Sequence, residues 1–315
     1  MTTITAYLAP EGYLQELLQE LHEFGDLTEV TQTFDRLILT QGPPVRAHWA
    51  QNIWLNPREI PFESISQATQ ELRKIQRNWA LYSSQLHRRG QLIADGLPKI
   101  TSKPVQFPSV LPTLPMGSWT LLDTNLLLAS PNCSSLFPHG EIHFEEDKTS
   151  PPSRAYLKLW EALTIAGQSP PGPGTKCLDM GSSPGGWTWA LHELGASVIS
   201  VDKAPLTRAI EALPRVRSLK RDAFTLTPGE VGPVDWFFSD VICYPQKLLE
   251  LVLKWLAAGT CRHFICTIKF QGKELSASDH QAVRGLAAIP GSKIIHLSHN
   301  KHELTWMKIG RPTSH

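Results

Sequence analysis

A glycine-rich turn between two apolar stretches constrains the fold of this 315-residue chain more than any other feature. The run from Cys177 to Trp187 reads Cys-Leu-Asp-Met-Gly-Ser-Ser-Pro-Gly-Gly-Trp, so a strand ending near Asp179 passes through glycines into a helix. Glycine in such a turn lets the backbone approach a ligand, because no Cβ stands in the way. The spacing is G-x-x-P-G-G and not G-x-G-x-x-G, which disfavours a diphosphate cradle and therefore a dehydrogenase.

From Lys176 onward, short β-type segments alternate with helical ones, which predicts a doubly wound α/β sheet. In such a sheet the ligand lies beyond the carboxyl ends of the strands, where the strand order reverses. Asp202 follows the second strand and is placed to accept the hydroxyls of a ribose. Asp222 follows the third strand and could accept from an adenine amine, although by itself it is better explained as a helix cap. The expected strands are 176–180, 197–201, 217–219, 234–239, 263–269, 293–297 and 304–309, and the expected helices are 187–194 and 246–257.

The N-terminal part has a different pattern, which predicts a smaller α+β domain over residues 1–118 and a second domain over residues 119–315. Leu14, Leu17 and Leu21 lie on one face of a helix expected from Tyr13 to Phe24. The other expected elements are β structure over 28–40, a helix over 64–89, a proline-rich connector over 103–115 and a strand over 119–129.

Composition and charge exclude several classes of protein. The most apolar stretch, residues 248–258, is too short to span a membrane, and no basic residue precedes an apolar run at the N-terminus as in a secretory signal. The five cysteines form no CxxC pair, which disfavours a disulfide framework or a four-cysteine zinc site and favours the cytoplasm. The net charge of +1 excludes a uniformly basic surface, but residues 71–103 carry seven basic and two acidic side chains. Such a stripe is more often the solvated face of a helix, although it could also bind an anionic partner.

The glycine turn, followed by Val201-Asp-Lys-Ala-Pro205, resembles the S-adenosylmethionine loop of the FtsJ-like ribose 2′-O-methyltransferases. The resemblance runs from Ser153 to Ile309, about half of the chain, and includes motifs around Lys158, Asp240, Lys269 and Glu303. It implies a Rossmann-like class I methyltransferase sheet with S-adenosyl-L-methionine as cofactor and no required metal. The implied cofactor-binding residues are Asp179, Gly181, Ser182, Ser183, Pro184, Gly185, Gly186, Trp187, Asp202, Asp222 and Asp240.

Within this family, Asp240-Val with Pro245 and the run from Trp255 to Arg262 resemble the bacterial M-type members, which methylate a cytidine ribose of 23S ribosomal RNA. This resemblance implies an RNA partner, either 23S rRNA or a pre-ribosomal particle, and a cytoplasmic enzyme without membrane contact. It also implies that the N-terminal domain is a THUMP-like RNA-binding domain.

The resemblance further implies a catalytic tetrad of Lys158, Asp240, Lys269 and Glu303. A ribose 2′-hydroxyl is a poor nucleophile, so a base must remove its proton during attack on the methyl sulfonium. A lysine can act as that base when a second ammonium close by lowers its pKa. We expect Lys269 to be the base, Asp240 to orient it beside the methyl donor, and Glu303 to fix Lys158 or the ribose.

Two alternatives stay open at this point. Methylation of a base nitrogen is disfavoured, because the segment from Asp240 to Tyr244 lacks the prolines of the usual Asn/Asp-Pro-Pro-aromatic run. The chain could also be an RNA-binding protein that has the methyltransferase fold but a different acceptor or no activity.

Overall fold

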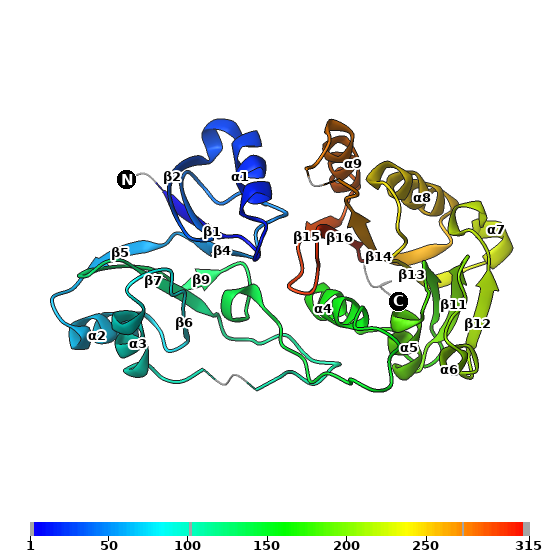
Figure 1. Cartoon of the computed structure of the whole chain (residues 1–315), viewed down its shortest axis with the longest axis horizontal. Coiled ribbons are helices and arrows are strands. Elements are labelled where there is room, and N and C mark those ends of the chain that lie inside the picture. Colours follow the sequence, from blue (N-terminus) through cyan, green and yellow to red (C-terminus); the bar gives the residue numbers. More distant parts are fainter. Residues whose placement is uncertain (1–2, 101–102, 273, 311–315) are drawn as a thin grey trace, which may run out of the picture. The chain divides into compact units, whose positions relative to one another are not determined.

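The computed structural model describes residues 3–100, 103–272 and 274–310, and the chain is shown in Figure 1. It divides into two compact units, of which unit 1 comprises Met1–Val105 and Leu111–His143. Unit 2 comprises Gln106–Val110 and Phe144–His315. Among the described residues, no helix is both long enough and apolar enough to cross a lipid bilayer.

The boundary expected between residues 118 and 119 is wrong. Strands β7 (Gly117–Asp123) and β8 (Leu126–Ser130) form an antiparallel hairpin that belongs to unit 1. They belong there because β7 pairs with β6 (Trp79–Leu81) and β8 pairs with β5 (Arg58–Pro61). The expected strand over 119–129 is therefore this hairpin, and the two units meet in sequence near residue 143.

Unit 1 holds two β-sheets with the strand orders β2-β3-β1-β4-β9 and β5-β8-β7-β6. Helix α1 (Leu14–Glu23) confirms the helix expected over Tyr13 to Phe24. Helices α2 and α3 pack their buried residues with those of the second sheet in one hydrophobic cluster. The remaining elements of unit 1 are β1 (Ile4–Leu8), β2 (Glu29–Phe34), β3 (Leu37–Gln41), β4 (Asn52–Leu55), β9 (Asn132–Cys133), α2 (Ile65–Ile75) and α3 (His87–Asp95).

The single helix expected over residues 64–89 is also wrong. Helix α2 ends at Ile75, and the chain turns extended at Gln76 before β6. Pairing of β6 with β7 buries Trp79, which is 4% exposed, so a long-range pairing overrides the local helical pattern. Trp79 belongs to the hydrophobic core of this sheet, where it is not available to stack on a nucleobase.

Unit 2 contains a seven-stranded sheet in its described part, with the order β12-β11-β10-β13-β14-β16-β15. The first five strands are parallel, and β16 is antiparallel to both of its neighbours. The chain order reverses between β10 and β13, so the carboxyl ends of these two strands form the switch point. The strands are β10 (Lys176–Met180), β11 (Ser197–Asp202), β12 (Val216–Lys220), β13 (Val234–Ser239), β14 (Cys261–Lys269), β15 (Ser292–Ile295) and β16 (Glu303–Lys308).

Helices cover both faces of this sheet, as the doubly wound prediction requires. Figure 1 shows α8 and α9 on one face and α4 and α5 on the other. Central strands such as β13 and β14 are apolar runs because both of their faces are buried, and the rings of Phe237, Phe264 and Trp306 form one packed series. The helices of unit 2 are α4 (Tyr156–Ala166), α5 (Gly186–Glu193), α6 (Arg208–Glu211), α7 (Pro228–Val231), α8 (Pro245–Ala258) and α9 (Ala277–Ala287).

The proline-rich connector contributes a short segment to unit 2. Residues 106–110 lie in that unit, and the ring of Phe107 stacks on Trp160 of α4 with centroids 4.8 Å apart. In its described residues, 103–115, the connector forms neither a helix nor a strand of any sheet, as the prolines predict.

Candidate active site

The glycine turn lies at the switch point, between the carboxyl ends of β10 and β13. Gly181 has φ +79, and a Cβ placed there would lie 2.5 Å from the Cα of Val241, in the loop after β13. The backbone N–H of Asp240 donates to the carbonyl of Met180 at 3.0 Å, which holds the two loops together. Gly181 is therefore required for the packing of one loop on the other, a role that the sequence pattern did not predict.

A cavity of about 300 Å³ opens at these strand ends. Five of the predicted cofactor-binding residues line it: Gly181, Ser183, Asp202, Asp222 and Asp240. Lys203, Phe224, Ile242 and the predicted base Lys269 line it as well, and of these only Lys269 was expected in the site. Among the described residues, the lining does not include the predicted positions Asp179, Ser182, Pro184, Gly185, Gly186 and Trp187.

Asp202 and Asp222 present carboxylates to the cavity, and both already accept hydrogen bonds. Asp202 accepts from the backbone N–H groups of Ser183 at 3.0 Å and Ala204 at 2.9 Å, one on each oxygen. Asp222 accepts from the N–H of Phe224 at 2.9 Å and pairs with Lys203 Nζ at 2.8 Å. The bond from Lys203 lowers the pKa of Asp222. A carboxylate has about four acceptor sites, so both residues can still receive hydroxyl or amine donors.

Asp179 lies beneath the glycine turn and is completely buried. Its Oδ2 accepts from the Thr188 hydroxyl at 2.7 Å, whereas its Oδ1 has no hydrogen-bond partner in the described part of the chain. Burial raises the pKa of Asp179 to about 7, and the nearby carboxylates of Asp240 and Asp202 act in the same direction. Asp179 thus supports the turn from inside the sheet, in contact with the first turn of α5.

The four predicted catalytic residues lie together, and two of them, Asp240 and Lys269, line this cavity. Asp240 Oδ1 lies 3.1 Å from Lys158 Nζ and 3.1 Å from Lys269 Nζ, so one carboxylate oxygen contacts both ammonium groups. Glu303 Oε1 lies 2.6 Å from Lys158 Nζ. Lys269 is the last residue of β14 and Glu303 the first of β16, and the antiparallel register places them directly opposite each other.

Burial and charge fix the state of Lys158 in this cluster. Its side chain is 8% exposed, and burial alone would lower its pKa. The carboxylates of Asp240 and Glu303 outweigh burial and raise the pKa of Lys158 above its ordinary value. The pKa of Asp240 is lowered in the same way, because Lys158 and Lys269 outweigh the opposite effect of burial. Lys158 therefore stays an ammonium in this site.

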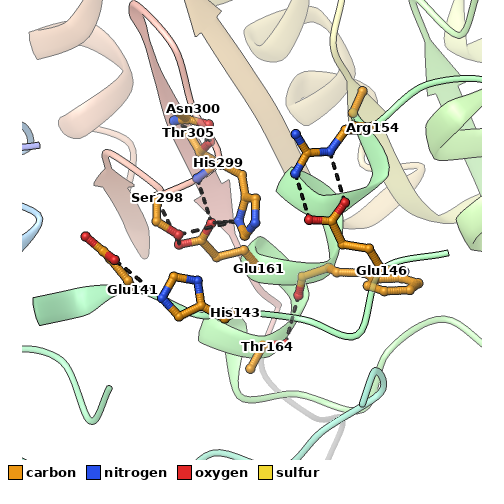
Figure 2. A network of polar contacts seen from close by, with 12 residues as sticks. Glu141, His143, Glu146, Arg154, Glu161, Thr164, Ser298, His299, Asn300 and Thr305 are labelled. Atoms are coloured by element: carbon orange, nitrogen blue, oxygen red, sulfur yellow. Dashed lines mark hydrogen bonds and ion pairs between the residues drawn. The ribbon is translucent and has the colours of Figure 1, made fainter. Parts of the chain in front are cut away.

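Glu161 was not expected from the sequence; it lies one helical turn after Lys158 on α4 and is fully buried. Figure 2 shows its carboxylate facing Ser298 and His299 in the loop between β15 and β16. The signal in the sequence is a glutamate within the largely apolar segment Tyr156–Ala166, since a buried carboxylate needs partners, but the sequence does not name them.

The strand order, the glycine turn and the acids at the ends of β10, β11 and β13 define unit 2 as a Rossmann-like domain of the class I methyltransferase type. Residues 151–271 match the family described as FtsJ-like methyltransferase, which confirms the expected resemblance over this segment.

Two curated relatives are similar to about half of this chain. The ribosomal RNA large subunit methyltransferase M of Azoarcus sp. (strain BH72) is 34% identical over 165 residues, which cover 49% of this chain and 45% of that protein. The protein of that name from Thauera aminoaromatica is 32% identical over 191 residues, 57% of this chain and 52% of its own length. This chain therefore spans about half the length of the curated relatives it matches.

Among solved structures, the fibrillarin pre-rRNA processing protein of Methanococcus jannaschii is similar over 49% of this chain and 75% of its own. The identity is 21% and the TM-score is 0.39. A likeness this distant does not bear on function.

Proposed function

We propose that this chain is an S-adenosylmethionine-dependent RNA ribose 2′-O-methyltransferase that acts on a cytidine of 23S ribosomal RNA. One observation carries the proposal: a single oxygen of Asp240 contacts the ammonium groups of both Lys158 and Lys269 at the edge of the cavity. The match of residues 151–271 to the FtsJ-like family and the names of the curated relatives support the reaction and its RNA substrate.

The donor set of the cavity fits S-adenosylmethionine. Asp202 offers acceptors for the two ribose hydroxyls and Asp222 for the adenine amine, while Phe224 provides an aromatic ring beside them. Asp240 places a negative charge where the positively charged sulfur would lie. When bound, this cofactor supplies an electrophilic methyl group on a sulfonium.

The lysines divide the proton chemistry between them. Lys158 is held as an ammonium by two carboxylates and could donate a hydrogen bond to the ribose. Lys269 lines the cavity and would accept the proton of the 2′-hydroxyl as the oxygen attacks. Asp240 would then stabilise the ammonium formed on Lys269. It would also hold Lys269 Nζ in place to take the proton while the 2′-oxygen attacks in line.

We further propose that unit 1 is a THUMP-like domain that binds RNA away from the reacting ribose. Arg73, Lys74, Arg77 and Arg88 are all exposed on or next to α2 and α3. Reversing two of these charges, Arg73→Glu with Arg88→Glu, should weaken RNA binding and reduce its salt slope by about 1 for each phosphate that the variant no longer binds. Unchanged binding at every salt concentration would contradict this role of unit 1.

Transfer of a tritiated methyl group from S-adenosylmethionine into unmodified 23S rRNA tests the reaction. We expect label in an alkali-resistant dinucleotide, because a 2′-O-methyl group blocks hydrolysis, and loss of that label with Lys269→Met. Lys176→Met is the matched control, since Lys176 is exposed at the opposite end of β10. Label in alkali-labile mononucleotides would indicate base methylation instead. Cofactor binding without transfer to naked rRNA or to a pre-ribosomal particle would favour the inactive RNA-binding alternative.

A further inference from the structure

The carboxylate of Glu161 receives four hydrogen bonds from two consecutive residues of the β15–β16 loop. Its Oε1 accepts from the backbone N–H of Ser298 at 2.8 Å and from the Ser298 hydroxyl at 2.9 Å. Its Oε2 accepts from the backbone N–H of His299 at 3.0 Å and lies 2.6 Å from His299 Nδ1. Figure 2 shows these contacts converging on one buried side chain.

These contacts satisfy both oxygens of the buried side chain. Three of the four partner groups are donors, namely the two backbone N–H groups and the Ser298 hydroxyl. The fourth partner is His299 Nδ1, and the direction of that hydrogen bond follows the tautomer of the ring. A buried carboxyl group is costly unless its oxygens are satisfied, and here each oxygen has two partners. A neutral amide could not take Glu161's place, because its NH₂ group would face the N–H donors of the loop.

The anchored loop leads directly to Glu303. Within it, the Asn300 side chain donates to the carbonyl of Glu303 at 3.1 Å and to the Thr305 hydroxyl at 3.2 Å. Asn300 is itself buried, so the segment between Glu161's partners and Glu303 has little freedom. The contacts that hold His299 in place therefore also restrict where β16 begins.

The same helix holds both ends of this loop. Lys158 and Glu161 are three residues apart on α4 and share one face of the helix. Glu161 holds the beginning of the loop through Ser298 and His299, and Lys158 meets its end through Glu303 at 2.6 Å. Glu303 is thus held by the β14–β16 pairing on one side and follows the anchored loop on the other.

We propose that Glu161 is a positioning residue: by fixing Ser298 and His299 it sets Glu303 against Lys158 and so maintains the charged state of the catalytic cluster. The proposal rests on the proposed function only for its activity readout. It names a residue outside the cavity, which touches neither the cofactor site nor the reacting atoms.

The test compares Glu161→Gln with Thr164→Ala in the full chain. Thr164 lies one turn further along α4 and is buried, and within the described part of the chain its hydroxyl donates to the carbonyl of Trp160 in the same helix. The two variants therefore disturb the same helix, but only the first reaches the loop. Ser298→Ala, which removes one of the four donors and keeps the backbone N–H, is the milder variant if Glu161→Gln does not fold.

The first readout is the rate at which acetic anhydride acylates Lys158, followed by peptide mass spectrometry. Loss of Glu303 from its side should lower the pKa of Lys158, and a fall of one pKa unit makes the reactive free amine about tenfold more abundant. We expect a rise of about tenfold or more for Glu161→Gln, a smaller rise for Ser298→Ala, and a change within about twofold for Thr164→Ala.

The second readout is methyl transfer. We expect kcat to fall about tenfold or more with Glu161→Gln while the affinity for S-adenosylmethionine stays unchanged, because Glu161 does not line the cavity. Equal Lys158 reactivity in wild type and Glu161→Gln, or an equal rise in Thr164→Ala, would overturn the proposal. If wild type transfers no methyl group the proposed function fails, yet the acylation rates still decide the role of Glu161.

Discussion

Replacing Asp179 by Asn should change how the stability of the protein depends on pH. Asp179 is fully buried, and only one of its oxygens has a hydrogen-bond partner among the described residues, Thr188 at 2.7 Å. Burial raises its pKa from the ordinary value of 3.8 to about 7. The folded protein therefore binds this proton more tightly than the unfolded chain does.

The sign and size of the effect follow from that difference. A raised carboxyl pKa contributes stability that is fully present below the unfolded pKa and is lost as the pH rises through the folded pKa. From 3.8 to about 7 the complete loss amounts to ~4 kcal/mol, of which ~2 kcal/mol falls between about pH 5.5 and about pH 8.5. Asparagine does not titrate, so Asp179→Asn escapes this loss.

Urea unfolding of wild type and Asp179→Asn at both pH values measures the difference. The free energy of unfolding of the variant, relative to wild type, should improve by ~2 kcal/mol on going from about pH 5.5 to about pH 8.5. Titrating groups remote from Asp179 contribute equally to both proteins and cancel. A relative stability that does not change with pH would refute the burial argument. At low pH the carboxyl group of Asp179 is protonated and neutral, like the side chain of Asn. If wild type binds S-adenosylmethionine more weakly under that condition, Asp179 has a direct role in the cofactor site.

Two further substitutions test the packing of unit 2. Gly181→Ala should destabilise the protein by ~2 kcal/mol more than Gly174→Ala. Both positions have positive φ, but of the two only Gly181 would bring its new Cβ to 2.5 Å from a neighbour, the Cα of Val241. Equal melting temperatures of the two variants would contradict the close approach of the two loops. Ser276→Ala should lower the free energy of unfolding by ~1 kcal/mol, because Ser276 and Asp279 form the capping box of α9. An unchanged free energy of unfolding would mean that fraying of the first turn of α9 does not affect stability.

The strands of unit 2 were predictable because their signal is local. In a parallel sheet covered on both faces, a central strand is a short apolar run between turn residues, and the predicted bounds of β10 and β13 agree with the structure residue for residue. Helix α9 was not predicted, although Ser276 and Asp279 form a capping box that the sequence displays.

Unit 1 shows where prediction from local patterns fails. Nothing local marks Trp79–Leu81 as a strand, because these residues are extended only through pairing with Gly117–Trp119, almost forty positions later in the chain. The proline-rich segment between them looked like a domain boundary, yet the chain returns to unit 1 after it. Contacts of this range depend on the whole fold, and they leave no periodic pattern in the three residues Trp79–Leu81.

In the candidate site, the four residues predicted to be catalytic lie together in the structure, but the sequence did not predict that Asp240 contacts both lysines. They meet because β13 and β14 end, β16 begins and α4 passes at the same end of the strands. The four residues are Lys158, Asp240, Lys269 and Glu303. Gly181 lines the cavity, but the sequence did not predict its close approach to Val241 of the same chain. Glu161 was missed because its partners, Ser298 and His299, are more than 130 positions away.

The asymmetry of the two lysines bears on which of them is the base. Lys158 is 8% exposed and contacts two carboxylates, whereas Lys269 is 18% exposed and, among the described residues, forms an ion pair with Asp240 alone. A base must pass between a neutral and a charged state, and a lysine held by two buried carboxylates cannot do so without leaving one of them unpaired. Lys269 can lose its proton while Asp240 keeps Lys158 as a partner, so the cluster never contains an isolated carboxylate. This arrangement supports Lys269 as the residue that receives the ribose proton and Lys158 as the charge that stays fixed.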